Sequence, residues 1–138
     1  WDLFVLAGNP TAHKDAYRGS SNISADNMFN SPDGLAFDSK GMLWIQTDGN
    51  ISNKGDFAGM GNNQMLVGDP QTGEIRRFMV GPIGCEVTGS TWSADRRTMF
   101  VGIQHPGARG GSHFPDGGQS VPRSTVIAIR RDDGKAIG

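Results

Sequence analysis

The sequence predicts an all-β fold, namely a β-propeller fragment of about two four-stranded antiparallel blades. Residues 31–48 recur in altered form as residues 87–104, and each copy combines two short apolar segments with a turn. A second hairpin pattern follows each copy, and the chain has no sustained helical period. Glycine, a turn residue, makes up 21 of 138 positions, against an average of roughly 7%. A repeated unit of four strands is typical of a propeller blade.

The first 30 residues contain one apolar segment, Leu3–Ala7, which predicts a strand stopped by Gly8 and Pro10. The polar stretch after it predicts a loop, with a helix possible only within residues 22–30. We interpret residues 1–30 as a strand and loop that belong to a preceding blade.

The first complete blade is predicted over residues 31–80. Its first hairpin pairs residues 35–37 with 43–46 around a turn in which Gly41 supplies a positive φ. A Gly/Asn-rich loop follows, and a second hairpin then pairs residues 64–67 with 74–78.

The second blade is predicted over residues 81–138 and repeats this order. Three strands are predicted at 89–92, 98–101 and 125–129, and a fourth begins at 135–137. A long Gly-rich loop at 106–120 separates its two hairpins. Propeller loops gather at one mouth of the central channel, so the long loops are where we expect function.

Composition excludes several classes of partner. Thirteen basic and fourteen acidic residues give a net charge of −1, and without a basic stripe neither nucleic acid nor an anionic membrane is the expected partner. No apolar run approaches the roughly 20 residues of a membrane-spanning helix. A single cysteine rules out an internal disulfide. No signal peptide is present, but the chain begins at Trp1, so this says little about the compartment.

Three acidic residues at the predicted strand mouths are candidate metal ligands. Asp33 precedes the first strand of one blade, Asp48 ends the second strand, and Glu86 lies at the corresponding mouth of the next blade. Carboxylate oxygens suit a hard cation such as Ca²⁺. The alternatives are a turn-capping role for Asp33, a loop-starting role for Asp48 and an ion pair with arginine for Glu86.

Other candidates carry weaker signals. His105, at a strand end, is a candidate metal ligand, proton donor or phosphate contact, or a simple loop residue. Arg109 and Arg123 flank the long loop and are candidate anion contacts, and His105 and Arg123 are the two candidate catalytic residues. Cys85 is more typical of a small buried apolar group than of a nucleophile. Three amides either offer oxygen ligands or bond to loop backbone: Asn62, Asn63 and Gln64.

Specific motifs resemble known families. The stretch PDGLAFDSKGMLW at 32–44 resembles the calcium-dependent lactonases of the regucalcin and gluconolactonase type. A longer ordered set resembles the C-terminal part of the PhoX-type bacterial alkaline phosphatases: WIQTDG at 44–49, NQML at 63–66, GPIGCEVTG at 81–89, QHPG at 104–107, FPDG at 114–117 and PRS at 122–124.

The second resemblance implies a six-bladed propeller that hydrolyses phosphate monoesters with calcium and iron (Ca²⁺ and Fe³⁺) at the channel mouth. It also implies export by the twin-arginine route to the periplasm or beyond. It makes Glu86 the best candidate metal ligand, followed by Asp33 and Asp48. The cysteine ligand of that family lies in upstream blades, so Cys85 is not its counterpart.

Three functions therefore stay open: a fragment of a metal-dependent phosphomonoesterase, a lactonase-like calcium propeller, or a non-catalytic propeller scaffold segment. Two blades cannot close a ring, since closed propellers use about 4–8. Their apolar faces would be exposed, so we expect self-association. Three chains would complete a six-bladed ring.

Overall fold

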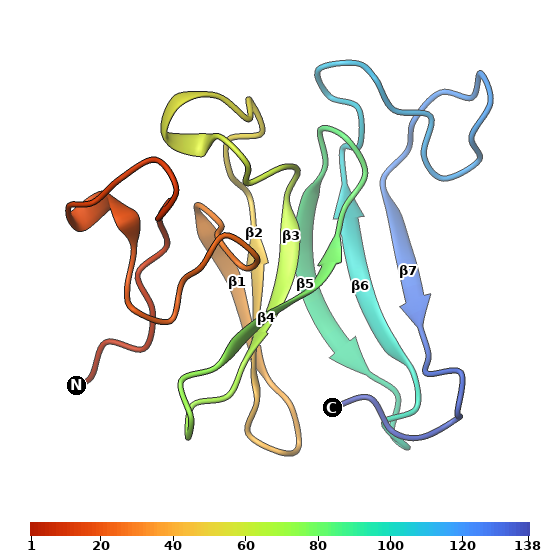
Figure 1. The fold of residues 1–138 in the computed structure, drawn as a ribbon. Helices are drawn as coiled ribbons and strands as arrows, with labels where there is room; N and C mark the ends of the chain where they lie inside the picture. The colour runs from red at the N-terminus through yellow and green to blue at the C-terminus, as the bar shows by residue number, and fades with distance from the viewer.

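The computed structural model describes all residues from Trp1 to Gly138 and shows two antiparallel sheets (Figure 1). Neighbouring strands pair in sequence order within each sheet. The first sheet contains β1 (Pro32–Phe37), β2 (Leu43–Thr47), β3 (Gln64–Gly68) and β4 (Ile75–Val80). The second contains β5 (Glu86–Trp92), β6 (Met99–Gln104) and β7 (Thr125–Ile129). The predicted all-β class is confirmed.

The hairpin turns form where the sequence predicts them, because aspartate side chains bond to their backbone. In the β1–β2 turn, the Asp38 carboxylate accepts hydrogen bonds from the amides of Lys40 at 2.8 Å and Met42 at 3.0 Å, and Gly41 adopts a φ of 79°. Asp69 plays the same part between β3 and β4 by accepting from the amide of Gln71. Such local bonds fix turn geometry independently of the core.

The first strand of each sheet contains an irregularity at a corresponding position. The β1–β2 register shifts between Pro32 and Leu35, and the β5–β6 register shifts between Thr88 and Ser90. Gly34 and Gly89 lie at these points. An extra residue bends a strand and increases its twist. The two copies of the repeat therefore share an irregular first strand, β1 in one sheet and β5 in the other.

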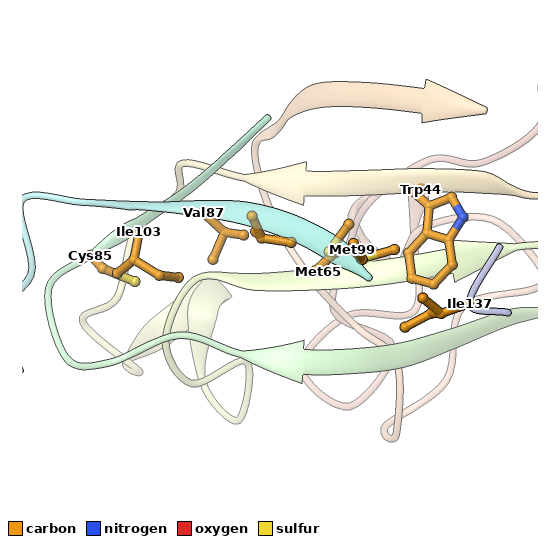
Figure 2. Packing of buried hydrophobic residues seen from close by; sticks show 8 residues of the cluster. Trp44, Met65, Cys85, Val87, Met99, Ile103 and Ile137 are labelled. Atoms are coloured by element: carbon orange, nitrogen blue, oxygen red, sulfur yellow. The ribbon is translucent and has the colours of Figure 1, made fainter. Parts of the chain in front are cut away.

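The two sheets pack face to face through a central core. β5 contacts β1, β2 and β3 across the interface. Figure 2 shows the core as a row of side chains, with Cys85 and Ile103 at one end and Trp44 and Ile137 at the other. This central core consists of Trp44, Met65, Cys85, Val87, Met99, Val101, Ile103 and Ile137. Burial of this apolar surface holds the two sheets together.

The predicted strand at Leu3–Ala7 and the predicted helix within residues 22–30 are both wrong. Residues 1–30 contribute one isolated bridge, between Gly8 and Phe29, and a short 3-10 helix, Ala16–Arg18. Polar side chains form hydrogen bonds with backbone groups of this segment that would otherwise pair with a neighbouring strand. The Ser20 hydroxyl accepts from the Leu6 amide at 2.8 Å, and local bonds of this kind compete with sheet ladders. Whether this segment belongs to a preceding blade stays a prediction.

The second sheet has three strands rather than the predicted four. Residues 135–138 do not pair with β7. The Ile137 amide instead donates to the carbonyl of Arg96 at 2.7 Å, and the Ile137 side chain closes one end of the central core. Apolar burial therefore positions this segment across the end of the sandwich instead of along a sheet edge.

Both outer faces of the sandwich leave apolar side chains exposed. Phe37 and Leu35 in β1, and Val126 in β7, are each more than half exposed, and Phe100 in β6 is 37% exposed. The repeat pattern predicts core positions for Trp44, Trp92, Phe37 and Phe100. The prediction is confirmed for Trp44, a member of the central core, and for Trp92, which packs against it. It is wrong for Phe37 and Phe100, because both lie on faces that no second sheet covers. None of the helical turns is long and apolar enough to cross a membrane.

Candidate metal site

The meander brings chemically active residues to one end of the molecule. Strand direction alternates, so β1 and β5 begin at the end where β2 and β6 finish. Figure 1 shows the long loops after β2 and β6 at this end and the short hairpin turns at the other. Asp33, Asp48, Glu86 and His105 all lie at the loop end, as the repeat predicts for the three carboxylates.

Three of these residues form a compact cluster. One ligand atom each from Asp48, Glu86 and His105 lies within 4.8 Å of the others. The pairing of Glu86 with Gln104 in the β5–β6 register places His105 directly beside Glu86. Asp48 comes from the other sheet. We call these three residues, which are a candidate for binding a metal ion, the metal site.

Glu86 occupies the least exposed position of the site, with 14% of its side chain accessible. Burial raises the pKa of its carboxyl above the ordinary value, and the negative charges of Asp48 and then Asp33 raise it further, while the His105 imidazole lowers it. Desolvation and like charges both disfavour an ionised carboxyl. A cation at this position would relieve both effects. Asp33 thus acts on the site through its charge but is outside the cluster.

The orientation of His105 leaves one ring nitrogen facing the carboxylate. Its Nδ1 lies 3.3 Å from the carbonyl oxygen of Gly84, which can only accept, so Nδ1 donates. Its Nε2 lies 3.4 Å from Oε2 of Glu86. A neutral ring would then direct a lone pair at a carboxylate, an arrangement that needs a proton or a metal ion between the two atoms. A histidine whose other nitrogen bonds to a backbone carbonyl is a common metal ligand.

The backbone around His105 is constrained to make this contact. His105 has a φ of 39°, in the left-handed region, and its amide donates to the Ser124 hydroxyl at 2.9 Å. Gly84 has a φ of 72°, and a Cβ there would approach the backbone nitrogen of Gly107 to 3.2 Å. Glycine at position 84 therefore lets the segment before β5 approach the loop after β6 closely. The sequence alone does not predict this requirement for glycine.

A cavity of about 170 Å³ opens beside the cluster. Asp48, His105 and Arg109 line it, so it brings acidic, basic and imidazole groups together. Arg123 lies after the long loop, exposed and paired with Asp116. Of the two arginines that flank this loop in the sequence, Arg109 is the one that lines the cavity. The catalytic role predicted for Arg123 stays a prediction.

The donor set fits a metal ion. Carboxylate oxygens suit Ca²⁺, and an imidazole nitrogen with carboxylates suits iron or manganese. Ca²⁺ usually takes six to eight oxygen ligands, more than Asp48 and Glu86 supply. The site thus has the chemistry of part of a metal centre that needs further ligands.

Cys85 is packed as an apolar side chain. It is 1% exposed and belongs to the central core. Burial raises the pKa of its thiol to about 11, so the reactive thiolate is scarce near neutral pH.

We expect Cys85 to resist an aromatic disulfide reagent at pH 8 in the folded chain and to react fully in denaturant. Thiol release followed by absorbance measures both. Fast reaction of the folded chain would contradict the buried placement of Cys85.

Comparison with known proteins gives the family. The family model described as alkaline phosphatase PhoX matches residues 1–107. This chain belongs to the PhoX alkaline phosphatase family. The six resemblance motifs extend to residue 124, so they continue beyond the matched range. A comparison with curated proteins finds no match.

A solved PhoX structure has the same fold. The structure of Pseudomonas fluorescens PhoX in complex with vanadate, a transition state analogue, is 66% identical to this chain with a TM-score of 0.96. The match covers 99% of this chain and 24% of the solved PhoX chain. This chain therefore corresponds to about a quarter of that phosphatase.

Proposed function

We propose that this chain forms part of the catalytic propeller of a metal-dependent phosphomonoesterase and supplies ligands to a metal centre shared with other blades. The convergence of Asp48, Glu86 and His105 at the loop end of two adjacent sheets carries the proposal. Membership of the PhoX family supports the reaction class.

The chemistry of phosphate ester hydrolysis suggests a role for each residue that lines this end of the chain. A bound metal ion neutralises charge on the phosphoryl oxygens and activates a nucleophile. In this chain, Asp48 and Glu86 would hold such ions, with Asp33 as a further candidate whose charge reaches Glu86, and the Nδ1 bond to Gly84 would keep Nε2 of His105 available as a ligand. Arg109 would contact a phosphoryl oxygen from the cavity wall.

The metals that we propose are Ca²⁺ and Fe³⁺. The carboxylates match the first, and the imidazole next to carboxylates matches the second. The solved relative is in complex with vanadate, a transition state analogue. This supports a phosphate ester as the substrate class for the complete protein. Family membership also supports a periplasmic or secreted location, reached by twin-arginine export.

The test is hydrolysis of p-nitrophenyl phosphate by the complete protein before and after chelation. We expect chelation to abolish activity and Ca²⁺ with Fe³⁺ to restore it. Hydrolysis of a lactone without phosphatase activity would favour the lactonase-like alternative instead. Inactivity towards both substrates in fully metal-loaded protein would favour the scaffold alternative.

We also expect this chain alone to self-associate. Leu35 and Phe37 on one outer face, and Phe100 and Val126 on the other, leave apolar surface at both flanks of the sandwich. Exposed apolar patches of this kind are typical of interaction surfaces. Light scattering should detect assemblies larger than a monomer, with three chains completing a six-bladed ring. A monomer across the accessible concentration range would contradict this expectation.

A further inference from the structure

We propose that Asn63 is a positioning residue that fixes the distance between the Asp48 and Glu86 carboxylates. Asn63 precedes β3 and is 6% exposed. Its side chain bonds to the residues on both sides of Asp48 and to the residue before Glu86. The inference deepens the proposed function and rests on the proposed metal site.

The amide oxygen of Asn63 holds the end of β2. Its Oδ1 accepts from the Thr47 hydroxyl at 2.9 Å and from the Gly49 amide at 2.7 Å. The chain is thus held immediately before and after Asp48. The Thr47 hydroxyl in turn accepts from the Gln64 amide at 2.9 Å, which ties β2 to β3 at the same point.

The amide nitrogen reaches the other sheet. Nδ2 of Asn63 donates to the carbonyl oxygen of Cys85 at 2.8 Å and to that of Gly49 at 3.4 Å. The backbone carbonyl of Asn63 also accepts from the Gly81 amide at 2.8 Å. One buried side chain therefore connects the segment around Asp48 with the segment that leads into Glu86.

The hydrogen bonds also fix which way the amide faces. Both lone-pair positions of Oδ1 and both Nδ2 protons are used, and rotation by 180° would place Oδ1 against the Cys85 carbonyl. The oxygen consequently has no free position for a metal ion. Of the two roles that the sequence leaves open for Asn63, backbone bonding is the one that the geometry supports.

A directional link matters here because the rest of the interface is mostly apolar. Apolar contacts hold the sheets together but resist sliding weakly, since the hydrophobic effect is non-directional. Asp48 and Glu86 belong to different sheets, so their separation depends on how the sheets align. The hydrogen bond from the Asn63 amide to the Cys85 carbonyl resists sliding of one sheet past the other at the loop end, next to Asp48 and Glu86.

Asn27 provides a matched control. It is 7% exposed, and its amide likewise donates twice, to the carbonyls of Asn22 at 3.0 Å and Ile75 at 2.8 Å, and accepts twice from Ser24. It links the N-terminal segment to β4 and contacts no part of the metal site. Replacement of either asparagine by alanine removes the same number of bonds from a similarly buried position.

The experiment measures Mn²⁺ binding by the complete protein stripped of its metals, with electron paramagnetic resonance detecting free Mn²⁺, and amide hydrogen exchange at Gly49 without metal. For Asn63→Ala we expect Mn²⁺ affinity to fall about 10–100-fold, as for loss of a residue that orients a ligand, and Gly49 exchange to accelerate. For Asn27→Ala we expect neither change. Thr47→Val, which preserves shape, should give a smaller change in the same direction.

The two readouts separate the possible failures. If Asn63→Ala and Asn27→Ala alter Mn²⁺ affinity equally, or if Gly49 exchange is unchanged in Asn63→Ala, the positioning role is overturned. If the wild-type complete protein, stripped of its metals, binds no Mn²⁺ at millimolar concentration, the metal site of the proposed function fails, and with it the role of Asn63 towards metal. Should Asn63→Ala not fold, Thr47→Val decides by the same two measurements.

Discussion

Replacement of Glu86 by glutamine should lower metal affinity by at least about 100-fold, more than loss of a residue that only orients a ligand. Glutamine keeps the size of the side chain but removes the charge that a cation needs. The Glu86 carboxylate also lies close to ligand atoms from both sheets, namely those of Asp48 after β2 and His105 after β6. Calcium and manganese titrations of wild type and variant measure the loss.

The phosphatase activity of the complete protein should fall in parallel. Glu74→Gln is the matched control, because Glu74 is exposed in the β3–β4 turn, where it pairs with Arg76 at 2.7 Å. We expect Glu74→Gln to bind metal like the wild type. If Glu86→Gln binds metal with wild-type affinity, Glu86 is not a metal ligand, and its contact with His105 is an ordinary side-chain pair.

Replacement of Met65 by alanine should lower the free energy of unfolding by about 2–5 kcal/mol. Met65 is fully buried in the central core between the two sheets. Truncation removes its apolar contacts and leaves a cavity that the surrounding strands fill only in part. Urea denaturation with linear extrapolation gives the difference.

Leu35→Ala is the control for this change, because Leu35 is 65% exposed on an outer face. Its free energy of unfolding should change little. Equal stability of the two variants would mean that the central core does not hold the sheets together.

The sequence predicts best where local chemistry decides. Asp38 with Gly41 in one turn and Asp69 in another fix hairpins through bonds to neighbouring residues, and those hairpins formed at the expected places. The repeat also placed Asp33, Asp48 and Glu86 at one end. These conclusions need only strand alternation and turn type, both of which are written in short segments of sequence.

Features that depend on distant partners could not be predicted. Leu3–Ala7 has the composition of a strand, but Ser20, fourteen residues after Leu6, bonds to its backbone. Asn63 finds its partner Cys85 across the sheet interface, 22 residues away. The sequence offers amide oxygens at Asn63 but gives no sign of which atoms they face, because that depends on how two sheets pack.

The decisive measurement is anomalous diffraction from a crystal of the complete protein, stripped of its metals and soaked in Mn²⁺. We expect an anomalous scattering peak at about 2–2.6 Å from carboxylate oxygens of Asp48 and Glu86, with Nε2 of His105 facing it. An empty position between these three residues, with Glu86 bonded to His105 and Mn²⁺ bound only elsewhere, would contradict it.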